Sequence, residues 1–189
     1  PWIYSFSWGL DRSDVAVQWL GFLYVFHRSD PDGLNKREMR TVLRSVTDES
    51  RNRFIFWLGR VGAKNENGWR ELIVPFINEV WPRERRYCGS GSVRAWVVLL
   101  AEAKDCFPTV YMAVKKFLVP VEMNEHSFYR FTRELNDGVP ITARFPEEVL
   151  DLMDTVTPRV LATPPYELSK VLVVIAEARL ELTSDPRYF

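Results

Sequence analysis

Apolar side chains recur along most of this chain at the spacing of an α-helix. In the segment LNKREMRTVLRSV, for example, Met39, Val42, Leu43 and Val46 lie one or three residues apart and share one helical face. No stretch after residue 10 alternates between apolar and polar residues over five or more positions, as a strand would. Gly62 stands at a position where the predicted helix at 49–62 can end, since glycine often follows the last turn of a helix. The pattern predicts an all-α chain with helices at about 14–27, 34–46, 49–62, 68–80, 92–105, 108–119, 125–136, 146–157 and 165–179.

The first residues follow a different pattern. Trp2, Tyr4, Phe6 and Trp8 alternate with other residues, which is typical of extended backbone. This segment is either a short strand or an arm that lays four aromatic rings onto the helical body, and the four rings are candidate contact residues. We therefore expect an extended N-terminal arm over residues 1–12, followed by one helical-repeat domain over residues 13–189.

Part of the helical pattern repeats when the sequence is shifted by 38 residues. The Phe-Pro pair at 107–108 then aligns with the pair at 145–146, and the prolines at 82, 120 and 158 align with one another. Apolar positions between these markers also align, at steps of 4, 3 and 4 residues that follow one stripe of a helix. The repeat predicts three equivalent helices within residues 69–158, with four aligned positions: Trp69, Phe107 and Phe145; Ile73, Tyr111 and Val149; Phe76, Val114 and Leu152; and Val80, Leu118 and Val156.

The prolines have a physical reason to bound these helices. Proline lacks a backbone N–H, which is not needed in the first helical turn, and Pro108 and Pro146 stand there. Pro82, Pro120 and Pro158 cannot continue a helix, and each disfavours helical geometry at the preceding residue. We therefore interpret these prolines as boundaries between repeated units.

Helices with one apolar stripe require neighbours, because each pair leaves a face that only another pair can cover. We therefore predict a HEAT-like α–α solenoid of stacked helix pairs, with a period near 38 to 40 residues. The alternate helices repeat more loosely: VLLAEA at 98–103 resembles VIAEA at 174–178, at a shift of 75 residues. An irregular helical bundle whose repeat is partly coincidental is the alternative.

Composition limits the partner and the location. The 189 residues include 25 Lys plus Arg and 25 Asp plus Glu, so the overall charge gives no support to a nucleic-acid or anionic-membrane partner. The most apolar run, 15–26, is too short to span a bilayer and predicts a central buried helix, or a docking helix without its partner domain. Two cysteines and no signal-peptide pattern predict a cytoplasmic protein with free thiols. Because the chain does not begin with Met, we expect a fragment of a longer protein.

The motifs that usually carry chemistry are absent or incomplete. The turn YCGSGSVRAW lacks the lysine of a phosphate-binding loop, the third glycine of a dinucleotide fingerprint and the first glycine of a nucleophile elbow. Cys88, Cys106, His27 and His126 are scattered, without the spacing of metal ligands. We therefore expect a chain that is not an enzyme and has no catalytic, cofactor-binding or metal-binding residues.

Two short basic segments are candidates for a second kind of contact. They are PRERR at 82–86 and the lysine pair in AVKKF. If these cations lie along one edge of the solenoid they can contact phosphates, so nucleic-acid binding is the alternative function; solvated loop charge is the other reading. The high Trp and Tyr content also allows a small-molecule pocket on the concave side, although core packing explains it more simply. The basic candidates are Arg83, Arg85, Arg86, Lys115 and Lys116.

Several short motifs together resemble a known group of proteins. They are W-x-x-x-I-x-x-F-x-x-x-V-W-P from Trp69, the LLAEA helix, FPEEVLDLMD from Phe145, and the final SDPRYF. Over about residues 48–189 the chain is similar to the C-terminal helical domains of large bacterial anti-phage defence proteins. In several of these, a sirtuin-like NAD-consuming domain or an NTPase domain lies upstream. The resemblance implies a regulatory, sensing or assembly module, and no catalytic residues carry over because the sirtuin-like active-site pattern is missing from this sequence.

The expected function follows from the architecture. A solenoid presents an extended surface made by one helix of each pair, which suits it to binding other proteins. We expect a non-catalytic module without cofactors whose partner is another part of the parent protein, a second copy of the chain, or a factor that it senses.

Overall fold

The computed structural model describes residues 36–63, 68–84, 87, 90–121, 125–136, 140–159 and 165–188. These residues form helices and the turns between them, with no strand among them, so the predicted all-α class is confirmed for this part of the chain. Several predictions lie outside the described residues: the helix at 14–27, the arm with Trp2, Tyr4, Phe6 and Trp8, and the residues Arg85, Arg86 and Cys88.

The described helices agree with most of the predicted ranges to within a few residues. The longer ones are α3 (Lys36–Ser45), α4 (Asp48–Ala63), α6 (Ser90–Glu102), α8 (Glu125–Asn136), α10 (Pro146–Val156) and α11 (Tyr166–Ala178). The predicted helix at 108–119 is shorter, since α7 (Phe107–Val114) passes into the 3-10 turn η4 (Lys115–Phe117). Short elements that the pattern did not predict are the 3-10 turn η3 (Lys104–Cys106), α9 (Ile141–Arg144), and the 3-10 turns η5 (Leu180–Ser184) and η6 (Pro186–Tyr188).

The predicted helix at 68–80 is interrupted by a change in helix type. It begins as a π-helical segment, η1 (Trp69–Ile73), and continues as α5 (Val74–Glu79). Pro75 gives the physical reason, because its ring would clash with the carbonyl four residues earlier in a regular α-helix and it donates no hydrogen bond. The wider π turn places this proline in the first turn of a new α-helix, which tolerates it.

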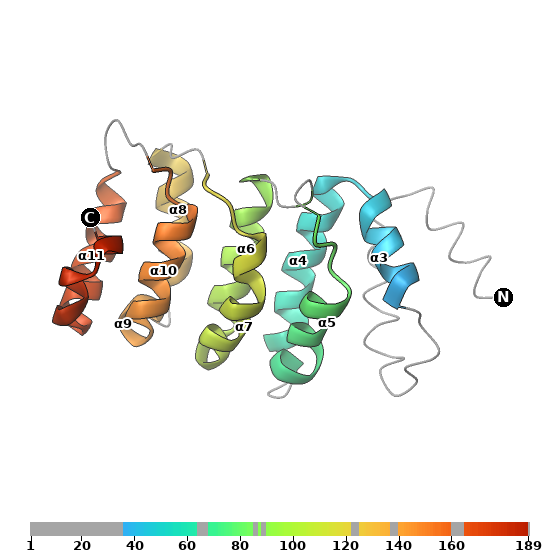
Figure 1. Cartoon of the computed structure of the whole chain (residues 1–189), viewed down its shortest axis with the longest axis horizontal. Coiled ribbons are helices and arrows are strands. Elements are labelled where there is room, and N and C mark those ends of the chain that lie inside the picture. The colour runs from blue at the N-terminus through green and yellow to red at the C-terminus, as the bar shows by residue number, and fades with distance from the viewer. Residues whose placement is uncertain are drawn as a thin grey trace.

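The helices stand side by side in a row that runs from α3 at one end to α11 at the other (Figure 1). Along one layer, α4 contacts α6, α6 contacts α8, and α8 contacts α11. In the other layer α5 contacts α7, and α7 reaches α10 through Phe107 and Phe145, whose rings stack with centroids 5.7 Å apart. Neighbouring units therefore contact each other in both layers.

The predicted apolar stripe forms the core of this row. All of its aligned side chains are buried except Phe145, which is half-buried. Pro108 and Pro146 stand in the first turns of α7 and α10, as predicted. Thr157 has extended backbone (ψ 130°) immediately before Pro158, as expected for a residue that precedes proline. The aligned positions therefore face the core, although the three segments differ in helix type: a π-helical segment precedes α5, a 3-10 turn follows α7, and α10 is a regular α-helix.

Aromatic rings join consecutive units at the centre of the row. The Trp81 ring meets the Trp96 ring edge-on, with centroids 4.9 Å apart, and lies 6.4 Å from the rings of Phe54 and Phe117. Trp96 in turn stacks on Phe117 at 5.6 Å. These four side chains are almost fully buried and come from α4, the turn after α5, α6 and η4, so each ring fills space between elements that are distant in sequence.

Polar contacts between units have nearly the same sequence separation as the repeat. Lys116 Nζ donates to Asn78 Oδ1 across 38 residues, and Tyr111 Oη donates to Asp151 across 40. In the backbone, the amide of Val121 donates to the carbonyl of Val156 at 2.9 Å. The same spacing in apolar and polar contacts indicates one repeated geometry along the row.

Gly62 does not end its helix, contrary to the prediction, because α4 continues to Ala63. The residue is buried against the ring of Trp69, and a Cβ built on it would lie 2.6 Å from Trp69 Cε2 and 2.8 Å from Cδ2 and Cζ2. Real Cβ atoms do not approach so closely, so glycine is required here for the close packing of α4 on η1.

We predict that Gly62→Ala destabilises the fold by about 2 kcal/mol, because the added methyl group must displace a buried Trp ring. Gly59→Ala is the matched control on the same helix, since its Cβ would lie 3.7 Å from Leu99 Cα, an ordinary contact. Alanine's better helix propensity should make this control neutral or up to about 1 kcal/mol more stable. Urea unfolding followed by circular dichroism measures both. Equal stability of the two variants would show that Trp69 does not pack as described.

Candidate functional site

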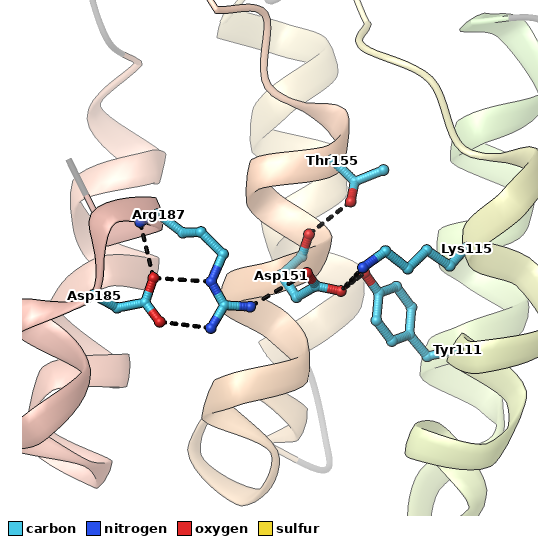
Figure 2. A network of polar contacts seen from close by, with 6 residues as sticks. All are labelled: Tyr111, Lys115, Asp151, Thr155, Asp185 and Arg187. Atoms are coloured by element: carbon cyan, nitrogen blue, oxygen red, sulfur yellow. Dashed lines mark hydrogen bonds and ion pairs between the residues drawn. The ribbon is translucent and has the colours of Figure 1, made fainter.

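The largest described polar network is centred on Asp151 of α10. Figure 2 shows this carboxylate between Arg187 on one side and Tyr111 and Lys115 on the other. Tyr111 Oη and Lys115 Nζ donate to Oδ2 at 2.6 and 2.5 Å, and the Arg187 guanidinium donates to Oδ1 at 3.2 Å. Asp151 thereby connects α7 and η4 on one side of α10 with η6 on the other.

The charges of this network reinforce one another. Burial raises the pKa of Asp151, but the hydrogen bonds from Lys115 and Tyr111 outweigh it and hold the pKa below the ordinary value. Burial, followed by the hydrogen bond to Asp151, raises the pKa of the Tyr111 phenol far above its ordinary value. Asp151 is therefore a carboxylate and Tyr111 a neutral donor at neutral pH, which suits a structural contact better than proton transfer.

The C-terminal turns are attached to α10 through the same network. Arg187 also donates to Asp185, from Nε to Oδ1 at 2.9 Å and from a terminal nitrogen to Oδ2 at 2.6 Å. This two-point contact, together with the backbone amide of Arg187, lowers the pKa of Asp185 to about 2. Tyr188 Oη donates to the carbonyl of Leu172 at 2.9 Å. Residues 185–188 are therefore fixed against both α10 and α11.

The structure brings together only part of the predicted basic edge. Arg83 and Lys116 are exposed and converge on Asn78: the Arg83 guanidinium donates to its carbonyl at 2.5 Å and Lys116 Nζ to its side-chain oxygen at 2.7 Å. Burial, followed by the charge of Arg83, lowers the pKa of Lys116. Within the described residues neither cation makes an ion pair with a carboxylate, whereas Lys115 is paired with Asp151. Lys115 therefore adds little free positive charge to this edge.

The terminal helix α11 carries apolar side chains in solvent. Tyr166 is 70% exposed and Val173 is 53% exposed, although both lie on a helix whose opposite face, with Val171 and Ile175, is buried. Leu180, two residues after the helix, is 74% exposed. Lys170 stands one turn after Tyr166, with Nζ 4.4 Å from the centroid of its ring. Apolar residues on both faces of one helix indicate that a second surface needs covering.

The repeated motif shows how coverage differs along the row. In α6, Val97 and Leu99 are fully buried, because α4 and α8 pack on either side of this helix. The positions 75 residues later in α11, Leu172 and Val174, are only half-buried. On the face that carries Val173 and Glu177, the aligned residues of α6, Val98 and Glu102, are half-buried and exposed as well.

Sequence reasoning did not find the Asp151 network or the exposed face of α11. The network has no sequence motif, since its members come from four elements and meet only through the repeat. A signal for α11 was present, because Tyr166 and Val173 are seven residues apart and lie opposite the buried stripe. The helix was interpreted only through its VIAEA motif, which describes the buried face.

Within the described residues, no three His, Cys, Asp or Glu side chains are grouped so that they could hold a metal ion. Cys106 is a half-buried free thiol in η3. None of the described helices is both long enough and apolar enough to cross a lipid bilayer.

Comparison with protein-family models, with curated proteins and with solved structures found no significant match to this chain.

We predict that Asp151→Asn lowers stability at pH 7 by about 2 kcal/mol and Tm by about 5 °C, because three donors lose a charged acceptor. Asp154→Asn, an exposed change on the same helix, should have little effect. The folded-state pKa of Asp151 lies below its ordinary 3.8. Its contribution is therefore complete above pH 3.8 and is lost as the pH falls through the lowered value. Thermal unfolding at pH 7 and near pH 3 checks both parts: a difference between wild type and Asn variant that grows on acidification would contradict the assignment.

Proposed function

We propose that the chain is a HEAT-like solenoid module whose function is to bind protein. The row of helices in two layers, the buried stripe repeated at 38 residues and the polar contacts at 36 to 40 residues support this architecture. Such a module has a continuous surface along the row, and its polar network at Asp151 is occupied by internal contacts. Binding rather than catalysis is the function that this arrangement favours.

The observation that carries the proposal is the exposed face of α11. A tyrosine and a valine that are more than half exposed, with Leu180 following them, form an apolar surface of the kind that marks protein contacts. Scattered single apolar residues on a surface need no explanation, but these belong to one helix and the residues directly after it.

The resemblance to helical domains of bacterial defence proteins extends the proposal to a biological role. In that role the chain is a cytoplasmic regulatory or sensing module, and the catalytic domain lies elsewhere in a longer protein. The extension rests on the motifs from Trp69 to the final SDPRYF.

A site-specific crosslink tests the protein contact. We predict that a photoreactive amino acid at position 173 forms one discrete crosslinked product in cells that express the chain, because this position lies in the surface that the proposed partner covers. The matched control carries the same amino acid at the exposed position 94, on α6 in the same helical layer. No product at position 173, or the same products at both positions, would refute a contact through α11.

Nucleic-acid binding is the second candidate, favoured by the convergence of Arg83 and Lys116 on Asn78 without a carboxylate partner among the described residues. Two cations held near each other by the carbonyl and the side chain of one residue are suited to adjacent phosphate oxygens.

For this candidate we predict salt-dependent binding of short DNA or RNA duplexes, measured by fluorescence anisotropy. Replacing both Arg83 and Lys116 by alanine should reduce the slope of log K against log salt by about 2, since two phosphate contacts are lost. Arg53→Ala removes an exposed arginine that pairs with Glu49 and serves as the control. Absence of binding at low salt excludes the candidate without affecting the protein-contact proposal.

A further inference from the structure

We infer that the exposed face of α11 binds a second copy of this chain, in an antiparallel pairing of the two α11 helices. The inference rests on the proposed function, because it names the partner for the surface described there. Two observations carry it: the stripe of exposed residues on α11 and the charge pattern of this stripe.

The stripe consists of Tyr166, Lys170, Val173 and Glu177. Steps of 4, 3 and 4 residues place these side chains on one face of the helix, and all four are exposed. Neither Lys170 nor Glu177 makes an ion pair with another described residue. The face therefore presents apolar groups together with one cation and one anion that are available to a partner.

The order of these residues is self-complementary about Val173. In an antiparallel pair related by a twofold axis near this residue, the two Val173 side chains meet at the centre. Lys170 of each copy then lies beside Glu177 of the other, which forms two symmetric ion pairs. One surface thus supplies both halves of each contact.

The internal packing of the chain favours a helix as the occupant. The elements that already pack on α11 are themselves helices, namely α8, α9 and α10. A second α11 continues that kind of packing, and its charges match where those of an unrelated helix need not.

The expected dimer is weak. A helix of 13 residues is about 20 Å long, so one helix pair buries less than the roughly 1,600 Å² of a standard stable interface. We therefore expect a dissociation constant in the micromolar range and a reversible equilibrium between monomer and dimer.

A charge exchange in the 189-residue chain tests this arrangement by sedimentation equilibrium from about 1 to about 200 µM, the range in which weak interfaces dissociate. We expect the unmodified chain to dimerise and Val173→Glu to remain monomeric, because two carboxylates, one from each copy, then meet at the centre. Lys170→Glu or Glu177→Lys alone should raise the dissociation constant about tenfold, since both symmetric pairs become repulsive. Combining Lys170→Glu with Glu177→Lys should restore the original dissociation constant, because both ion pairs then form again with the charges exchanged. All changed residues are exposed, and circular dichroism of each variant confirms that it folds.

The outcomes separate this inference from the protein-contact proposal. A chain that stays monomeric over the whole range, or a double exchange that stays as weak as the single variants, overturns the antiparallel pairing. If the chain is monomeric while position 173 still crosslinks to a different polypeptide, the self-pairing fails and the protein contact stands. If neither dimer nor crosslink forms, both fail.

Discussion

The structure depends on one constraint: a helix with an apolar stripe must be covered by helices from the neighbouring units. Trp81 illustrates how this requirement links neighbouring elements of the chain. Its ring is almost completely buried among Phe54, Trp96 and Phe117, which belong to three other elements of the chain. None of these elements can bury that ring alone, so the stability of each depends on the presence of the next. Burial of this ring therefore requires contacts between several neighbouring elements.

Polar contacts give this apolar packing its register. Apolar burial is non-directional, so stripes on adjacent helices could slide past one another by a turn at modest cost. Hydrogen bonds require defined distances and angles, and Asp151 receives three of them from elements on both sides of α10. Arg51 has a comparable role at the other end of the row: it is buried and donates to the carbonyls of Leu43 and Val46, which end α3. These charged side chains thus form internal hydrogen bonds, and these bonds hold neighbouring helices in place.

We propose that function resides in the surfaces of the row that remain exposed. The cations Arg83 and Lys116 share Asn78 on the side of the row formed by α5 and η4, and α11 exposes apolar residues at its end. The second surface is the stronger candidate, because Tyr166 and Val173 are apolar side chains that are more than half exposed.

Helix positions, the buried stripe and the proline boundaries could be predicted from the sequence, because each depends on side chains within a few residues of one another. Phe107, Val114 and Val149 are buried as their spacing predicts. The π turn before Pro75 and the role of Gly62 could not be predicted in this way. Gly62 is required by a Trp ring on the next helix, and the spacing within α4 contains no information about that ring.

By itself, then, the sequence determined which residues form helices and which face of each helix is buried, because local propensity and periodicity suffice for both. Only the tertiary structure decided which carboxylate accepts hydrogen bonds from Tyr111, Lys115 and Arg187, and which helix exposes apolar side chains to water. Those outcomes depend on how neighbouring units align in space, and residues 36 to 40 positions apart meet only after the row has formed.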